Sequence, residues 1–158
     1  MSKRWYAAHA ARCKVTPTLV TKFARVVLGS RYDLSFSEVS RARMRTLNRT
    51  HRGIDAATDI LSFPLSKQSG EIVICKPEVT THARAWHMPA RDYYRYLVIH
   101  GLVHLRGLDH GRIMDKVEKK FCKALDVLHP SHYRTPHGTT NSSRDRRGHL
   151  SGARRRRA

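Results

Sequence analysis

Acidic side chains are scarce in this chain, and long apolar runs are absent. Its 158 residues include 12 Asp and Glu against 31 Lys and Arg, a formal net charge of +19 at pH 7. No apolar run approaches the ~20 residues that span a membrane, and the N-terminal stretch MSKRWYAAHAARCK lacks the apolar segment of a secretory signal. We therefore expect a cytoplasmic protein.

Cysteine is also rare. Cys13, Cys75 and Cys122 are odd in number, and no two of them form a CxxC pair. This usage gives no indication of a disulfide framework, so we expect reduced side chains that pack as small apolar groups.

The surplus of positive charge predicts a polyanionic partner. Residues 1–130 hold 23 Lys and Arg against 11 Asp and Glu, and residues 131–158 hold 8 against 1. Nucleic acid is the most common partner of such a protein, although a general basic bias of the proteome would give the same charge. Charge of this kind concerns association and does not determine the fold.

Length and composition predict one domain followed by a tail. A chain of 158 residues is long enough for a single core and too short for two ordinary domains. Residues 131–158 are rich in Ser, Thr, Gly and Arg and have almost no large apolar side chains. We therefore expect a folded domain over residues 1–130 and a disordered basic tail that adds non-specific affinity for RNA.

The apolar pattern predicts helices mixed with short strands. Helix starts are expected at Pro17, after Ser40, at Pro77, at Pro89 and near Ile113, with the last helix ending before Pro130. Strands are expected at residues 3–10, 32–36, 59–65 and 71–75. Because no regular βαβ alternation is visible, we expect an α+β fold in which several helices pack on a small mixed β-sheet.

Three histidines in the stretch HGLVHLRGLDH indicate a metal site. His100 and His104 are four residues apart, so on a helix they share one face. Gly107 can adopt the left-handed conformation that turns the chain back and brings His110 to the same point. Three neutral imidazoles suit zinc and leave one coordination position open. A lone pair of histidines on a helix is more often a surface or core pair, but the third histidine and the glycine favour the metal.

The residue after the first histidine bears on which reaction the site could catalyse. The spacing matches the HExxHxxGxxH pattern of metzincin proteases, but Gly101 stands where those enzymes have the glutamate that acts as general base. Peptide hydrolysis by that mechanism is therefore not expected. Glycine inside a helix costs ~1 kcal/mol relative to alanine, so Gly101 indicates close backbone packing or close approach of a substrate.

These stretches together resemble one protein family. HGLVHLRGLDH resembles the H-G-x-x-H-L-x-G-x-D-H motif of the YbeY-type bacterial endoribonucleases, and LNRTHRGIDAATDILSFPL (Leu47 to Leu65) resembles their L-N-x-x-Y-R-x-x-D-x-x-T-D-V-L-S-F-P segment. Residues 71–75 match the strand that follows, so the resemblance extends over about residues 35–125. It implies an α+β fold, zinc dependence and a role in ribosomal RNA maturation.

On this resemblance we expect a zinc-dependent endoribonuclease with one Zn²⁺ per chain, which cleaves single-stranded regions of rRNA precursors. The ribosomal subunit or a ribosomal protein is an expected partner. Held by His100, His104 and His110, zinc would lower the pKa of a water molecule toward ~7 or polarise a phosphoryl oxygen, and the sequence does not choose between these roles.

Further site residues are expected in the upstream segment. Arg52 is the candidate catalytic residue, because a guanidinium group can hold two phosphate oxygens and stabilise the charge that develops on them. Arg49, Asp55 and Ser62 are the candidate substrate-binding residues. Asp109, beside the third histidine, can accept a hydrogen bond from a ligand histidine or cap the bend.

Two other functions are compatible with the same residues. One is a ribosome-assembly factor that binds RNA without cleaving it and whose zinc is structural, with a fourth ligand from Cys75, Cys122 or His87. The other is a metal hydrolase of peptide or amide bonds, which would need a carboxylate from outside the motif, such as Glu71 or Asp59.

Overall fold

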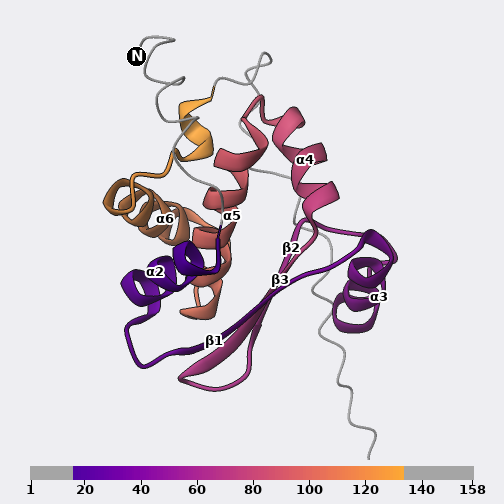
Figure 1. The fold of residues 1–158 in the computed structure, drawn as a ribbon, viewed down its shortest axis with the longest axis horizontal. Coiled ribbons are helices and arrows are strands. Elements are labelled where there is room, and N and C mark those ends of the chain that lie inside the picture. Colours follow the sequence, from indigo (N-terminus) through magenta and orange to yellow (C-terminus); the bar gives the residue numbers. More distant parts are fainter. Residues whose placement is uncertain (1–15, 134–158) are drawn as a thin grey trace, which may run out of the picture.

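The computed structural model describes residues 16–133 of the chain. The predicted strand at residues 3–10, Cys13 and nearly all of the predicted tail lie outside these residues. The elements in chain order are α2 (Pro17–Leu28), β1 (Asp33–Glu38), α3 (Arg41–Arg52), β2 (Ile60–Pro64), β3 (Ser69–Ile74), α4 (Lys76–Ala85), α5 (Ala90–Leu105), α6 (Arg112–Ala124) and the 3₁₀ turn η1 (Pro130–His132) (Figure 1).

The three strands form a mixed sheet in the order β1-β3-β2. β1 and β3 run parallel, with Phe36 opposite Ile72, whereas β2 and β3 run antiparallel, with Leu61 opposite Val73. A parallel pair needs a crossover between its strands, and the segment that contains α3 and β2 makes it. The predicted α+β fold with a small mixed sheet is confirmed.

Each face of the sheet packs against different helices, because side chains alternate between the faces along every strand. Ile72 and Ile74 point into the main core, which is formed with α2, α5 and α6. Leu61 and Val73 point the other way, into a smaller cluster with Met44 of α3. Figure 1 shows α5 between the sheet and the pair α2 and α6, and α3 on the opposite side of the sheet.

The helix starts and stops follow the predicted capping residues. Thr16 accepts a hydrogen bond from the backbone N–H of Leu19, and Ser40 accepts one from Arg43. Both side chains satisfy donors that a helix N-terminus leaves unpaired. Gly53 ends α3 in the left-handed conformation, with φ of 70°.

The last helix differs from the prediction. α6 ends at Ala124, shortly before Asp126, which takes a left-handed conformation with φ of 53°, and Ile113 near the start of the helix is 70% exposed. The buried side of α6 carries Met114, Glu118 and Cys122 instead. Val117 and Phe121 pack partly buried against the core beside this stripe, and Leu125 is buried just after the helix. The predicted helix is therefore present but ends earlier than expected.

The boundaries of β2 and of the domain, and the cysteines, can be compared with the predictions. Pro64 belongs to β2, at the end of an edge strand where no N–H is needed. The predicted domain boundary after residue 130 falls inside η1. Cys75 and Cys122 are buried free thiols, as predicted, and burial raises the pKa of Cys122 to about 12. Among residues 16–133, no helix is long and apolar enough to cross a membrane.

Candidate metal centre

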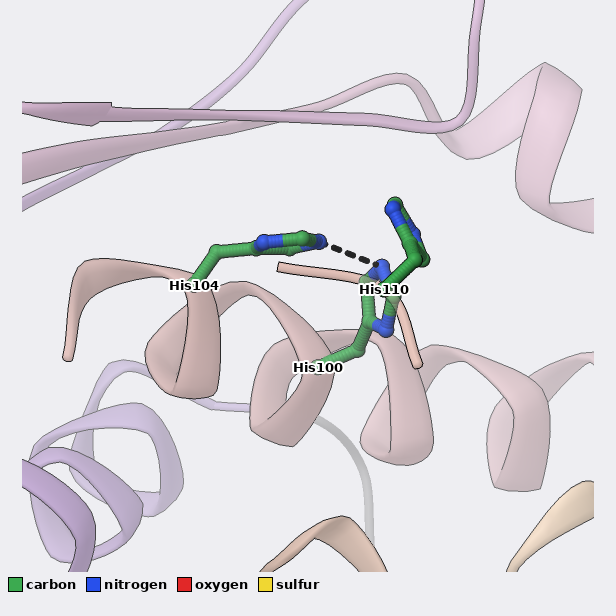
Figure 2. Close-up of side chains that lie close together, drawn as sticks. All are labelled: His100, His104 and His110. Carbon is green, nitrogen blue, oxygen red and sulfur yellow. Dashed lines mark hydrogen bonds between the residues drawn. The ribbon is translucent and has the colours of Figure 1, made fainter. Parts of the chain in front are cut away.

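The three histidines of the motif meet at one point, as predicted. His100 and His104 lie on one face of α5, in its last two turns. Gly107 follows the helix with φ of 81°, and the chain turns back so that His110 approaches the other two (Figure 2). The candidate ligand atoms of the three side chains all lie within 4.8 Å of one another.

Gly101 lets α5 lie unusually close to the sheet. A Cβ atom at this position would be 2.8 Å from Cδ1 of Ile60, 2.9 Å from Oγ of Ser62 and 3.1 Å from Cδ1 of Ile72. Any larger residue would push the helix away from β2 and β3. Of the two reasons expected for a glycine here, the structure therefore supports close packing.

The tautomer of His104 is determined by the turn that follows the helix. Its Nδ1 lies 2.9 Å from the carbonyl oxygen of Leu108, which can only accept a hydrogen bond. Nδ1 therefore carries the proton and Nε2 presents its lone pair to the centre. Burial, and then the nearby His100 and His110, lower the pKa of His104 to about 4, which favours the neutral form that binds a metal.

A buried carboxylate on α6 holds His100. Nδ1 of His100 lies 2.6 Å from Oε1 of Glu118, and Oε2 of Glu118 accepts a hydrogen bond of 3.2 Å from the hydroxyl of Tyr96. Glu118 is only 5% exposed. Burial alone would raise the pKa of Glu118, but the hydrogen bonds, that from His100 first, bring it down to about 2. The ionised carboxylate orients the His100 ring and directs its Nε2 to the centre.

The donor set fits a metal ion. The Nε2 atoms of His100 and His104 face each other at 3.2 Å (Figure 2). Because each of the two rings directs a lone pair to this point, a shared proton or a cation is needed to offset their repulsion. Nitrogen ligands of a tetrahedral zinc, at ~2.0–2.1 Å from the ion, lie about 3.3 Å apart, close to the observed separation.

A cavity of about 900 Å³ adjoins the histidines. His100 and His110 line it together with aromatic side chains, Trp86 and Tyr96 among them. The side chain of His129 is a second histidine contact of the Glu118 carboxylate, with Nε2 at 3.6 Å from Oε2. Nδ1 of His129 accepts the backbone N–H of Ser131, so Nε2 carries the proton and faces the carboxylate.

Within the described residues, the group of potential metal ligands consists of the three histidines alone. The three candidates for a fourth ligand, Cys75, Cys122 and His87, are not part of it. Cys75 is buried in the smaller cluster under α3. A site with three protein ligands is typical of catalytic rather than structural zinc.

The two carboxylates considered for peptide hydrolysis are not free beside the histidines. Asp59 lines the same cavity, but its Oδ2 is bound by the hydroxyl of Tyr93 at 2.7 Å and by Nδ1 of His82 at 2.8 Å. Glu71 lies on the other face of the sheet, where it lines a different hollow with Val73.

The remaining predicted site residues lie farther along the chain from the motif. Ser62 packs beside Gly101, on the α5 side of β2. Asp55 forms a bidentate pair with Arg45, with distances of 2.8 and 2.6 Å, and it lies 3.8 Å from Arg49. Arg52 ends α3 on an exposed surface and does not line the cavity beside the histidines. The catalytic role of Arg52 and the substrate contacts of the others stay predictions.

Glu118 and His129 were not among the predicted site residues. Asp109 was the expected acceptor for a histidine, but the carbonyl of Leu108 and the carboxylate of Glu118 take that role. One signal was present: Glu118 stands between Met114 and Cys122 in the buried stripe of α6, where an unpaired carboxylate would be costly. A charged residue at such a position needs a partner from another element.

The fold and the site define an α+β domain in which three converging histidines, which could hold a metal ion, lie beside a large cavity. A family profile described as Endoribonuclease YbeY matches residues 7–126. Proteins called Endoribonuclease YbeY from Cupriavidus necator and Aromatoleum aromaticum are 36% identical over 96 residues and 30% identical over 123 residues. These matches cover 54% and 73% of this chain, and 48% and 80% of the respective relatives.

A solved structure shares the fold. The solution structure of TM1509 from Thermotoga maritima superposes with a TM-score of 0.51 at 28% sequence identity, over 68% of this chain and 77% of that one. The chain belongs to the YbeY endoribonuclease family. It spans about half the length of the Cupriavidus relative.

Proposed function

We propose that this chain is a zinc-dependent endoribonuclease that cleaves phosphodiester bonds in single-stranded regions of rRNA precursors. A ribosomal subunit or a ribosomal protein is the proposed further partner, and the reaction takes place in the cytoplasm. Membership of a family whose relatives are called endoribonucleases supports the reaction class. The net charge of +19 supports a polyanionic substrate.

The observation that carries the proposal is the three-histidine centre with its positioned tautomers. His100, His104 and His110 would hold the metal through ring nitrogens, two of them directed by the Glu118 carboxylate and the Leu108 carbonyl. A bound zinc would supply Lewis acidity, either toward a water molecule or toward a phosphate oxygen. Because all of these ligands are neutral, the ion keeps its full positive charge toward an anionic substrate.

The protein side chains supply position and charge around that centre. The cavity of about 900 Å³ is large enough for a nucleotide, and its aromatic lining, including Trp86 and Tyr96, offers stacking surfaces for bases. Arg52 is the proposed second catalytic group, gripping two oxygens of the scissile phosphate with its planar fork. Arg49, Asp55 and Ser62 are the proposed contacts to the rest of the substrate.

Single-turnover cleavage of a single-stranded RNA tests the proposal directly. The full-length protein loaded with one zinc is expected to cleave the RNA and to leave the same sequence intact in a perfect duplex. His104→Ala, which removes one of the three ring nitrogens, should not cleave. His87→Asn is its matched control and should cleave like the wild type: it changes a histidine outside the centre, and asparagine tolerates the left-handed backbone, φ of 53°, at this position. Binding of RNA without metal-dependent cleavage would favour the non-catalytic assembly factor.

A further inference from the structure

A second hollow lies on the sheet face opposite the metal centre. It has a volume of about 450 Å³ and lies where α3 meets β2 and β3. α3 covers the end of this face around Leu61 and Val73, through Met44. Among the described residues, the rest of the face carries the hollow, which we call the α3 groove. Its lining includes Ser37, Arg43, His51, Phe63, Leu65 and Glu71.

The α3 groove has an aromatic and apolar wall. The rings of His51 and Phe63 lie 4.7 Å apart, tilted by 54°. Leu65, directly after β2, is 66% exposed and adds apolar surface to this wall. The wall therefore offers a π-face and apolar area of the kind on which a nucleobase stacks.

Positive charge surrounds the same groove. α3 contains five arginines and no acidic residue. Three of these arginines are paired with acidic side chains, and within residues 16–133 Arg43 and Arg52 have no such partner. Arg43 also lines the groove. The paired ones are Arg41 with Glu78, and Arg45 and Arg49 with Asp55.

Two polar groups lie deeper in the groove. Ser37 of β1 and Glu71 of β3 point to this face of the sheet. A carboxylate disfavours a phosphate, but it accepts hydrogen bonds from the exocyclic amino group of a base such as cytosine. The groove thus offers Ser37 and Glu71 to the edge of a base, and the guanidinium group of Arg43 to a phosphate.

The groove and the metal centre share one edge strand. Ile60 and Ser62 of β2 face Gly101 and the metal helix, whereas Leu61 and Phe63 face α3. β2 pairs only with β3, so its other edge is not covered by a strand of the described residues. Since α5 and α3 lie on opposite sides of the sheet (Figure 1), a single strand of RNA would have to pass over this edge to contact both sites.

We propose that the α3 groove binds one nucleotide of the single-stranded RNA whose neighbouring segment lies at the metal centre. Its base stacks on Phe63 and His51, and its phosphate pairs with Arg43. This site rests on the proposed function for the identity of the substrate. It explains why an apolar groove remains exposed beside a helix of arginines, and it makes the enzyme prefer substrates with unpaired nucleotides next to the cleavage position.

The test measures binding of a fully 2′-O-methylated single-stranded RNA to full-length, zinc-loaded protein by fluorescence anisotropy, with a gel to check that the RNA stays intact. His51→Ala, at an exposed position, is expected to weaken binding about tenfold because one stacking ring is lost, whereas His51→Phe keeps the ring and the affinity. Phe63→Leu is expected to weaken binding by a similar factor.

The charge contribution is measured separately, by salt dependence. Arg43→Gln is expected to reduce the slope of log K against log salt by about 0.7, the value for one phosphate contact on a single strand. Arg25→Gln, which removes the same charge from an exposed position of α2, is the matched control and should leave the slope unchanged.

The outcomes separate this site from the proposed function. Unchanged affinity in His51→Ala and Arg43→Gln would overturn the groove, even if the wild type cleaves RNA. Weaker binding in these variants, together with a wild type that does not cleave, would support the groove and contradict the nuclease. If Phe63→Leu fails to fold, the variants at the exposed positions His51 and Arg43 still test whether the groove binds RNA. Failure of the wild type to bind the probe would overturn the groove as well.

Discussion

The two faces of the small sheet are built in different ways. On the α5 face, a 16-residue helix lies directly on the strands through Gly101, and its polar side chains have buried partners. On the α3 face, a helix with five arginines covers only part of the sheet, and its ion pairs are exposed. The polar side chains near the histidines are therefore held by buried partners, whereas the paired arginines of the α3 face lie in solvent and can adapt.

The carboxylates Glu118 and Asp55 illustrate the difference. Both have a lowered pKa, Glu118 through hydrogen bonds that overcome its burial and Asp55 through its hydrogen bond to Arg45. Glu118 lies in the low dielectric of the core, where its bond to His100 is shielded from salt. Asp55 lies on the surface, so its pairs weaken as salt is added. The α3 face should therefore respond to ionic strength and the metal centre should not.

The largest effect is expected on the α5 face. His104→Ala should abolish stoichiometric zinc binding and cleavage, because two histidines hold the ion far more weakly than three. The fold should persist without the ion, since the core of helices and sheet does not depend on it. Metal analysis of the purified protein and far-UV circular dichroism measure these outcomes. Global unfolding of the variant, or of the wild type in chelator, would indicate a structural zinc.

Arg52→Lys tests whether the α3 face also takes part in chemistry. The substitution keeps the charge and loses the bidentate fork, so the single-turnover cleavage rate should fall about 100-fold, the effect of one lost charge-stabilising donor. Zinc content should not change. Arg84→Lys, at an exposed position near the end of α4, is the control. Equal rates in Arg52→Lys and wild type would confine the reaction to the α5 face.

Glu118→Gln tests how far the α5 face depends on the partner of its first histidine. The neutral amide no longer stabilises the protonated Nδ1 of His100, so zinc affinity should fall by about 10- to 100-fold. Competition with a chromophoric chelator measures it. Glu78→Gln is the control, because it makes the same change in a carboxylate of α4 that pairs with Arg41 and does not line the cavity beside the histidines. Unchanged affinity in Glu118→Gln would mean that packing alone orients the His100 ring.

Gly101→Val tests the close contact between α5 and the sheet and should change stability rather than chemistry. A branched side chain would meet Ile60, Ser62 and Ile72 and force α5 away from the sheet, which should cost about 2 kcal/mol of unfolding free energy in urea denaturation. Ala42→Val, at an exposed position of α3, is the control for the intrinsic cost of valine in a helix. A loss no larger than that of the control would show that the close helix–sheet contact is not tight.

Local sequence determined the parts of the molecule that depend on spacing within one segment. His100 and His104 share a face because a helix repeats every ~3.6 residues, and Gly107 allows the turn that returns His110. The caps at Thr16 and Ser40 are equally local, since a side chain bonds an N–H three residues later. Such contacts are formed by the segment itself and can be predicted from it.

Only the tertiary structure decided the contacts between residues that are far apart in the sequence. Glu118 is 18 residues from His100 and meets it only because α6 packs against α5. β1 likewise pairs in parallel with β3 only because the chain crosses over between them through α3 and β2. No local sequence pattern predicts the path of this crossover, which leaves α5 and α3 on opposite faces of the sheet. These contacts depend on how whole elements pack, because burying a carboxylate or closing a sheet is favourable only when the complementary surface is already present.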